Sequence, residues 1–129
     1  MMASSRGKGR ASKGERAYYA GKAAEEQVAR HYRDTRNGNV LHTRWRGKSG
    51  EIDLVIEEDG IVVCVEVKSS TNSDRAADAL SPAQQGRIMR AGEEFCADLE
   101  TGSLTEMRFD VALVSGDGRI DLIVNALSA

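Results

Sequence analysis

Two apolar runs separated by Asp59-Gly60 constrain the fold of this chain more than any other feature. Residues 51–58 (EIDLVIEE) and 61–68 (IVVCVEVK) are rich in β-branched residues. An Asp-Gly pair between two such runs is typical of a two-residue β-turn, so the sequence predicts an antiparallel hairpin. Because the runs are apolar at consecutive positions, we expect other elements to cover the hairpin on both faces.

The second strand of this hairpin ends with two charged residues, Glu66 and Lys68. Charged side chains are rarely buried without partners. With a two-residue turn, Glu58 pairs with Ile61, and Asp53 then lies opposite Glu66. A four-residue loop would instead leave Asp53 diagonal to Glu66. In either register we expect Asp53, Glu66 and Lys68 on one face of the hairpin.

This set of side chains is suited to one kind of chemistry. Two neighbouring carboxylates repel each other, and a divalent cation between them would remove the repulsion. Mg²⁺ and Mn²⁺ prefer such hard oxygen ligands, and an adjacent lysine can position water or neutralise developing negative charge. Asp53, Glu66 and Lys68 therefore predict metal-assisted phosphodiester hydrolysis. The alternative is a salt bridge between Lys68 and a carboxylate at a solvated strand end.

The remaining sequence predicts two helices and three further strands. Ala17, Ala24, Val28 and Tyr32 form an apolar stripe in a helix over residues 14–36. Ser81 is a candidate N-cap, with Pro82 at the first helical position, for a helix that extends to about residue 100. The predicted strands cover residues 40–46, 107–115 and 120–124. A strand, helix and strand in succession imply a parallel pair, so we expect an α/β fold with a mixed sheet between helices.

Composition limits the class of protein. The 129 residues suit a single domain, expected over 14–129 after a disordered basic tail over 1–13. No apolar run is long enough for a membrane span, and Cys64 and Cys96 lack CxxC spacing, which favours a cytoplasmic protein. Residues 1–48 hold twelve Lys and Arg against four Asp and Glu, whereas residues 49–129 hold six against sixteen. This asymmetry is consistent with a polyanion-binding surface, or with a tail that aids solubility.

Four motifs in order resemble a known family. They are GKAAEEQVARHY (21–32), RWRGKSGEIDLV (44–55), VEVK (65–68) and RFDV (108–111). Together they resemble the PD-(D/E)XK nuclease core and, more closely, the bacterial YraN-like family, whose fold is similar to that of Holliday-junction resolvases. The resemblance extends over residues 21–125 and implies an αβββαβ restriction-endonuclease-like core.

The resemblance also implies roles for individual residues. Asp53 and Glu66 would bind Mg²⁺ or Mn²⁺ with the Val67 carbonyl as a third ligand, and Lys68 would position or activate water. Glu25 would be a further acidic group facing the site, although its neighbour Glu26 is an alternative. The catalytic residues implied are Glu25, Asp53, Glu66 and Lys68.

Contacts to nucleic acid are expected on either side of this core. Arg44, Arg46 and Lys48 precede the acidic residues and could grip phosphates, or could simply line a solvated strand edge. The family pattern has a lysine in the opening turn of the second helix, where this chain has Gln84. Gln84 or Gln85 could orient water or contact a phosphate instead.

The function expected is therefore that of a metal-dependent endonuclease hydrolysing DNA phosphodiester bonds, with branched or damaged DNA as candidate substrates. Resolvase-like folds often act on two strands as dimers, so a homodimer is a candidate assembly. The alternative is a noncatalytic nucleic-acid-binding module on a nuclease-like fold. A third, weaker reading is a protein-interaction subunit in which the charged pair is structural.

Overall fold

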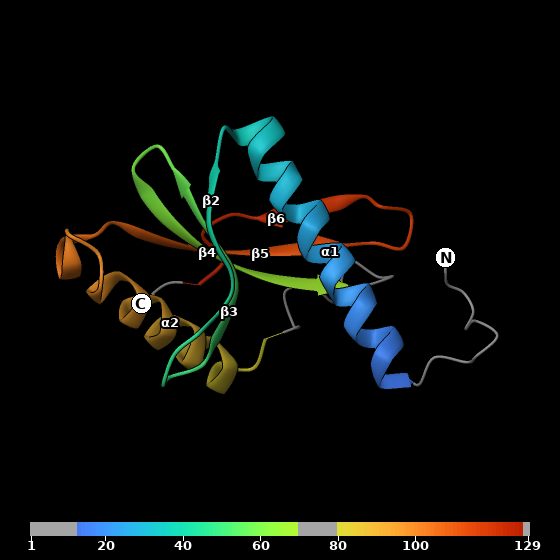
Figure 1. Ribbon diagram of the computed structural model, residues 1–129, viewed down its shortest axis with the longest axis horizontal. Helices are drawn as coiled ribbons and strands as arrows, with labels where there is room; N and C mark the ends of the chain where they lie inside the picture. Colours follow the sequence, from blue (N-terminus) through green and yellow to red (C-terminus); the bar gives the residue numbers. More distant parts are fainter. Residues whose placement is uncertain (1–12, 70–79, 128–129) are drawn as a thin grey trace, which may run out of the picture.

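A five-stranded mixed β-sheet forms the centre of the protein, with one helix on each face (Figure 1). The computed structural model describes residues 13–69 and 80–127, with side chains from residue 21 onwards. The strands lie in the order β2-β3-β4-β5-β6. The elements are α1 (Lys13–Arg36), β2 (Asn39–Arg46), β3 (Glu51–Glu58), β4 (Ile61–Ser69), α2 (Pro82–Ala97), a 3₁₀ turn (Gly102–Leu104), β5 (Met107–Val114) and β6 (Ile120–Ile123).

The predicted hairpin is confirmed in both turn and register. Asp59 has a φ of 53° and Gly60 a φ of 82°, as a two-residue turn of the I′ type requires. Glu58 pairs with Ile61, and the antiparallel ladder continues to Leu54 and Val65. The turn thus sets the register that directs Asp53 toward Glu66.

The parallel pair expected from the strand–helix–strand succession is also confirmed. β4 and β5 are parallel from the pair Val62–Met107 to the pair Ser69–Val114, and α2 lies in the connection between them. β2 and β6 add antiparallel edge strands. The chain therefore has the expected αβββαβ order, with β6 added after β5.

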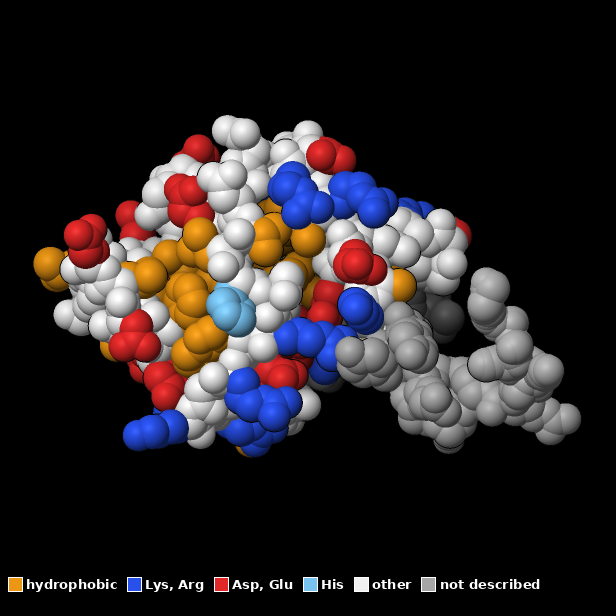
Figure 2. Space-filling view, viewed as in Figure 1, with side chains coloured by type: hydrophobic (Ala, Val, Ile, Leu, Met, Phe, Trp, Pro, Cys, Tyr) orange, Lys and Arg blue, Asp and Glu red, His pale blue; other side chains and the backbone are white. Residues whose placement is uncertain are grey.

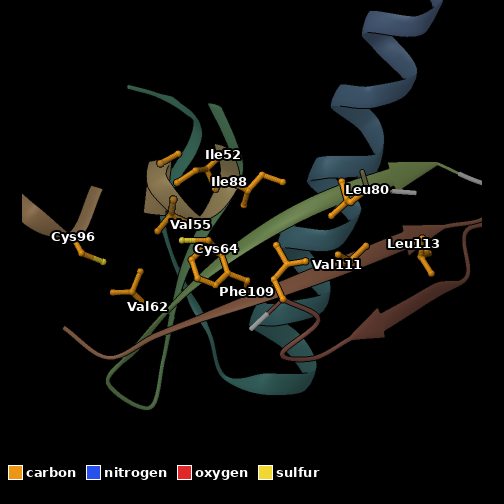
Figure 3. Packing of buried hydrophobic residues seen from close by; sticks show 12 residues of the cluster. Ile52, Val55, Val62, Cys64, Leu80, Ile88, Cys96, Phe109, Val111 and Leu113 are labelled. Atoms are coloured by element: carbon orange, nitrogen blue, oxygen red, sulfur yellow. The ribbon is translucent and has the colours of Figure 1, made fainter. Parts of the chain in front are cut away.

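α2 packs on one face of the sheet through a large apolar cluster. Cys64 of β4 and Phe109 of β5 lie beneath Ile88 and Ala91 of the helix (Figure 3). Trp45 adds an edge-to-face contact with Phe95, at 5.6 Å between ring centroids. Both cysteines, Cys64 and Cys96, are free thiols in this cluster, as their apolar surroundings in the sequence indicate.

α1 packs on the opposite face. Ala24, Val28 and Tyr32 of the predicted stripe are buried against Val63 and Val65 of β4 and their neighbours. The side chain of Ala17 lies outside the described residues. Because β4 contributes alternate side chains to the two clusters, the expectation that both faces of the hairpin are covered is confirmed.

The second helix begins where the sequence predicts and ends earlier. Ser81 is the N-cap, and its hydroxyl accepts a hydrogen bond from the Gln84 N–H. The helix ends at Ala97 rather than near residue 100, because the next N–H groups bond three residues back and Gly102 turns the chain at a φ of 51°. The first helix starts at Lys13, which was expected to be the last residue of a tail over residues 1–13; the rest of that tail lies outside the described residues.

Within the described ranges, neither helix is long and apolar enough to cross a lipid bilayer.

Candidate active site

The two hairpin strands separate at Asp53. The last pair of the β3–β4 ladder is Leu54 with Val65, so the ladder ends just before Asp53. Beyond this pair, the Asp53 side chain connects the two strands in place of the backbone: its Oδ2 accepts a hydrogen bond from the Val67 N–H at 2.8 Å. The carboxylate is thereby fixed between the two diverging strands.

The backbone is distorted on both sides of this point. Ile52 packs into the cluster beneath α2, whereas Leu54 packs into the cluster beneath α1, so the usual alternation is interrupted at Asp53. Across the β2–β3 ladder, Arg44 lies between the pairs formed by its neighbours and has a φ of 50°. A non-glycine residue in this left-handed region costs of order 1 kcal/mol or more. The strain coincides with the residues predicted to be functional.

Glu66 lies next to Asp53, as expected, although the ladder that was expected to pair them ends at Leu54 and Val65. Its side chain is 17% exposed, and its carboxyl group is hydrogen-bonded to the carboxyl group of Asp53. The Lys68 ammonium is 3.5 Å from Glu66 Oε2. Burial is the main reason that the pKa of Glu66 is raised to about 8, and the negative charge of Asp53 is the second. Lys68 acts in the opposite direction. At neutral pH this site therefore retains a proton that a cation could displace.

Glu25 approaches the same site from α1. Its side chain is 14% exposed and accepts a hydrogen bond from Arg44 Nε at 2.8 Å. Burial raises the pKa of Glu25, Arg44 counteracts this, and the charge of Asp53 raises the pKa further. Glu26 is exposed. The structure thus turns Glu25, and not its neighbour, toward Asp53.

The donor set suits one class of metal site. In the described part of the chain, no group of three or more His, Cys, Asp or Glu side chains is arranged to hold a metal ion. Asp53 and Glu66 alone offer two adjacent carboxylates, with the Val67 backbone beside them. Mg²⁺ is commonly held by one or two carboxylates together with waters and substrate phosphates. The residues fit such a shared, open site, and do not fit a closed protein cage.

The residues expected to contact nucleic acid differ in their surroundings. Arg44 is held by Glu25, whereas Arg46 is exposed and pairs with Glu51 at 3.0 Å. Lys48 is also exposed, and its backbone N–H bonds to Glu94. Arg46 and Lys48 therefore present their charge at the surface beside the start of β3.

Gln84 has a structural role that the sequence analysis did not assign, although a serine followed three residues later by glutamine is the sequence signature of a capping box. Its Oε1 accepts a hydrogen bond from the Ser81 N–H at 2.9 Å and completes a capping box with the Ser81 hydroxyl. Among the described residues, no hydrogen bond or ion pair connects Gln84 to Asp53, Glu66 or Lys68. Helix capping accounts for the position of this side chain, and its contact with nucleic acid stays a prediction.

Glu94 is a positioning residue that sequence reasoning missed. From α2, its carboxylate accepts hydrogen bonds from the N–H groups of Lys48 and Ser49, at 2.9 and 3.0 Å. It thereby holds the turn between β2 and β3 in place. A Cβ at Gly47 would lie 2.3 Å from the Trp45 ring, so this turn also requires a glycine. The four residues of this turn, GKSG (47–50), are typical of a turn, but nothing in the sequence identifies Glu94 as its partner.

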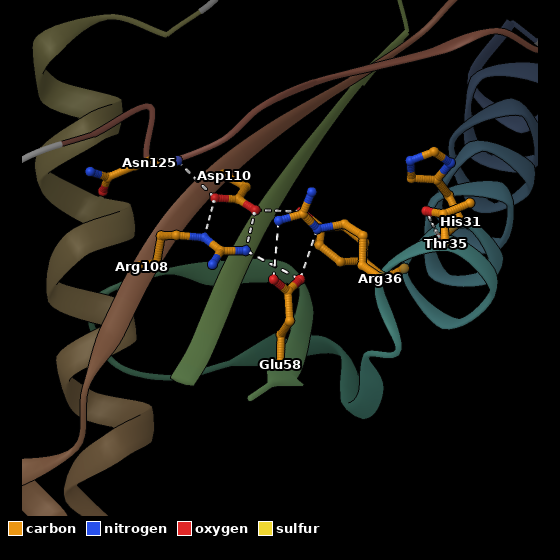
Figure 4. Close-up of polar contacts among 8 residues, drawn as sticks. His31, Thr35, Arg36, Glu58, Arg108, Asp110 and Asn125 are labelled. Atoms are coloured by element: carbon orange, nitrogen blue, oxygen red, sulfur yellow. Dashed lines mark hydrogen bonds and ion pairs between the residues drawn. The ribbon is translucent and has the colours of Figure 1, made fainter. Parts of the chain in front are cut away.

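The RFDV motif forms a buried polar network away from the candidate metal ligands (Figure 4). Asp110 is buried, and Arg108 donates two hydrogen bonds to it, at 2.9 and 3.1 Å. The Tyr32 hydroxyl and the Asn125 N–H donate to the same carboxylate, at 2.6 and 2.9 Å. Burial and the Asp110 contact raise the pKa of Tyr32. These bonds connect α1 to β5 and the chain beyond β6.

Glu58 extends this network to the end of β3. Arg36 donates to both of its carboxylate oxygens, at 2.8 and 3.1 Å, and Arg108 donates at 3.4 Å. The Arg36 contact is the main reason that the pKa of Glu58 is lowered. The network joins the C-terminal end of α1 to the sheet and contains none of the predicted metal ligands.

Comparison with known sequences identifies the family. A profile of the uncharacterised protein family UPF0102 matches residues 24–114. The chain belongs to the UPF0102 family. A UPF0102 protein of Roseobacter denitrificans is 51% identical over 116 residues, which cover 89% of this chain and 88% of that protein. A UPF0102 protein of Cereibacter sphaeroides is also 51% identical, over 90% of this chain and 98% of its own.

A further UPF0102 protein, of Ruegeria pomeroyi, is 47% identical over 90% of this chain and 94% of its own length. The segment that matches UPF0102 contains every predicted site residue, from Glu25 to Gln84. Because the family is uncharacterised, its name assigns no activity. The function must be argued from the geometry of the site.

Proposed function

We propose that this protein is a Mg²⁺- or Mn²⁺-dependent endonuclease that hydrolyses DNA phosphodiester bonds. The observation that carries the proposal is the contact between the carboxyl groups of Asp53 and Glu66, with Lys68 beside them, where β3 and β4 separate. The αβββαβ order and the Asp53…Glu66-Val67-Lys68 pattern resemble the PD-(D/E)XK nuclease core and support the same function.

Each residue has a definable role in this reaction. Asp53 and Glu66 would hold the cation, together with the Val67 carbonyl, waters and a substrate phosphate. The bound cation would polarise the phosphate and increase the acidity of a nearby water. Lys68 would orient the attacking water and neutralise charge developing on the phosphate. Glu25, held by Arg44, would be a further acidic group facing the site.

The test is a cleavage assay on linear, flapped, damaged and four-way DNA, with Mg²⁺, Mn²⁺ or a chelator. We expect metal-dependent products with at least one substrate. Asp53→Asn and Lys68→Ala should each lower the cleavage rate by about 10²-fold or more, as loss of a catalytic group usually does.

Asp121→Asn is a suitable control, because Asp121 is an exposed strand residue on β6. It should cleave like the unmodified protein. Absence of metal-dependent cleavage on every substrate would contradict the proposal, as would cleavage that survives both Asp53→Asn and Lys68→Ala unchanged.

A noncatalytic nucleic-acid-binding module is the second candidate. The observation that favours it is the opening turn of α2, where Gln84 caps the helix and no lysine is present. This alternative predicts salt-dependent DNA binding that survives Glu66→Gln, with no product formed by either protein.

A further inference from the structure

A groove between α1 and β2 lies beside the candidate active site. Its volume is about 500 Å³, within the range of ligand pockets. The helix contributes one face to it, at positions three and four residues apart: Lys22, Glu25, Glu26, Ala29, Arg30 and Arg33. A neighbouring face of α1, with Val28 and Tyr32, packs on the sheet. One face of α1 therefore packs on the core, and the adjacent face lines the groove.

The rim of the groove is cationic. Lys22, Arg30 and Arg33 are exposed, and within the described ranges none of them forms an ion pair with a carboxylate. Glu26 lies among them, and the fourth cation, Arg44, is bound to Glu25. Cations thus exceed carboxylates by four to two. Figure 2 shows Lys and Arg side chains along α1 and beside β2, with hydrophobic side chains visible between them.

The floor of the groove is aliphatic. Val40, which is partly exposed, offers most of this surface, while Ala29 and Leu54 are buried beneath it. A concavity of this size admits a single base or sugar, whereas a DNA duplex is too wide to enter it. Sites for unpaired nucleic acid commonly combine a cationic track for phosphates with apolar surface for bases.

The row of cations is longer than one phosphate group. Lys22 and Arg33 are eleven residues apart on α1, which corresponds to about 16 Å along a helix axis. This length favours a strand with several phosphates over a free nucleotide. Glu25 both lines the groove and faces Asp53, so a strand in the groove would continue to the candidate metal ligands.

We propose that this groove binds an unpaired strand of nucleic acid, with phosphates on Lys22, Arg30 and Arg33 and a sugar or base on the aliphatic floor. The preferred substrate is then DNA in which an unpaired segment adjoins the scissile bond. This inference rests on the proposed function for the choice of nucleic acid, but strand binding itself requires no cleavage.

Fluorescence anisotropy with a chelator present measures strand binding without cleavage. The probes are a short single-stranded oligonucleotide, the duplex of the same sequence and a mononucleotide. The unmodified protein should bind the single strand most tightly. Arg30→Ala/Arg33→Ala should weaken that binding about tenfold and lower the salt slope by about 1.4, since each phosphate contact on a single strand contributes about 0.7.

The matched control is Arg87→Ala/Arg90→Ala. These two arginines are also exposed and three residues apart, but they lie on α2, on the other side of the sheet. The control should bind the strand like the unmodified protein. Equal losses in the two double variants would mean that bulk charge alone attracts the strand, and would overturn the proposal.

A second pair of variants tests the interior of the groove. Thr43 is exposed on β2 and lines the groove. Thr43→Glu should weaken strand binding, because it places a negative charge among the phosphates, whereas Thr43→Gln should not. An unchanged affinity of Thr43→Glu, or a mononucleotide that binds as tightly as the strand, would contradict the proposal.

The same experiments separate this inference from the proposed function. A protein that binds the strand through Arg30 and Arg33 but cleaves no substrate with Mg²⁺ or Mn²⁺ would support the groove and overturn the nuclease proposal. A protein that cleaves DNA, yet keeps its full strand affinity in Arg30→Ala/Arg33→Ala, would do the reverse.

Discussion

Glu66 is a carboxyl group whose pKa is raised into the neutral range. Its pKa is raised from 4.5 to about 8 by burial and by the Asp53 carboxylate. The Lys68 ammonium, 3.5 Å from Glu66 Oε2, lowers this pKa but does not offset burial and the charge of Asp53. A site that keeps a proton between two carboxyl groups is ready to exchange it for a cation.

The metal-free protein should lose stability as the pH rises from about 4.5 to about 8. In this window the folded state retains a proton on Glu66 that the unfolded state has released, so the free energy of unfolding falls with pH. Above this range the contribution levels off. Urea unfolding at a series of pH values, with a chelator present, measures the slope. Glu66→Gln should remove this part of the slope, and an identical slope in that variant would contradict the assigned pKa.

Tyr32 provides a test of the buried network. Tyr32→Phe removes the hydroxyl that donates to buried Asp110 at 2.6 Å. We expect the free energy of unfolding to fall by about 1–3 kcal/mol, as for other buried polar groups that lose a partner. Thr35→Val is the control, because the Thr35 hydroxyl bonds to the His31 carbonyl on an exposed surface. It should change stability by less than about 0.5 kcal/mol, and an equal loss in both variants would contradict the importance of the network.

Sequence reasoning worked at the residue scale where local chemistry decided the outcome. The Asp-Gly turn and the register that it sets bring β3 and β4 together as far as Leu54 and Val65, and the strand period places Glu66 beside Lys68. The interruption of the alternation at Asp53 was not predicted. The contact between Arg44 and Glu25 was beyond it, because that contact depends on a left-handed residue in the middle of a strand. No residue type signals such a distortion when the position is not glycine.

α2 contains two glycines, Gly86 and Gly92, whose replacement by alanine should change the free energy of unfolding in opposite directions. Comparing the two variants tests how tightly α2 packs on the sheet. A Cβ at Gly92 would lie 2.8 Å from the Phe109 ring and 3.1 Å from Cys64 Sγ, both in the core. At Gly86 the nearest atom is the flexible end of Arg90, at 3.3 Å. Gly92→Ala should therefore lower the free energy of unfolding by about 1–3 kcal/mol through overpacking.

Gly86→Ala should instead raise the free energy of unfolding by up to about 1 kcal/mol, since alanine is the better helix former. Thermal or urea unfolding of both variants gives the comparison. Stabilisation by both substitutions would show that α2 is packed more loosely against Phe109 than described.

At the element scale, prediction from the sequence was least accurate at the ends of elements. Ser81 and Pro82 identified the start of α2, whereas its end at Ala97 depends on the 3₁₀ turn that follows. Gln84 was expected to contact substrate, and this stays a prediction; its place in the capping box was not anticipated. Long-range contacts such as that of Glu94 with the β2–β3 turn carry no local signal, so they required the assembled fold.

At the scale of the whole molecule, the fold determines where the uneven charge of the sequence lies on the surface. The cationic segment over residues 1–48 supplies all four groove cations, Lys22, Arg30, Arg33 and Arg44. The competing explanation was the tail over residues 1–13, nearly all of which lies outside the described residues. The sequence predicted that positive charge gathers in this part of the chain, but only the packing of α1 beside β2 shows where it forms a groove.

The two thiols report on the integrity of the whole fold. Burial raises the pKa of Cys64 to about 12 and also raises the pKa of Cys96, so neither thiol is expected to react as a thiolate in the native state. Labelling with a thiol reagent at pH 8 should therefore be negligible until the protein unfolds, and should then modify both cysteines together. Rapid labelling of native Cys64 would contradict a closed core beneath α2.

The central claim is that Asp53 and Glu66 form a divalent-metal site. Anomalous diffraction from crystals grown with Mn²⁺ tests it most directly. We predict one Mn²⁺ peak in contact with both carboxylates, and its loss in Asp53→Asn crystals but not in Asp121→Asn crystals. Crystals that contain Mn²⁺ yet show no peak there, with Glu66 still bonded to Asp53 and Lys68, would contradict the account.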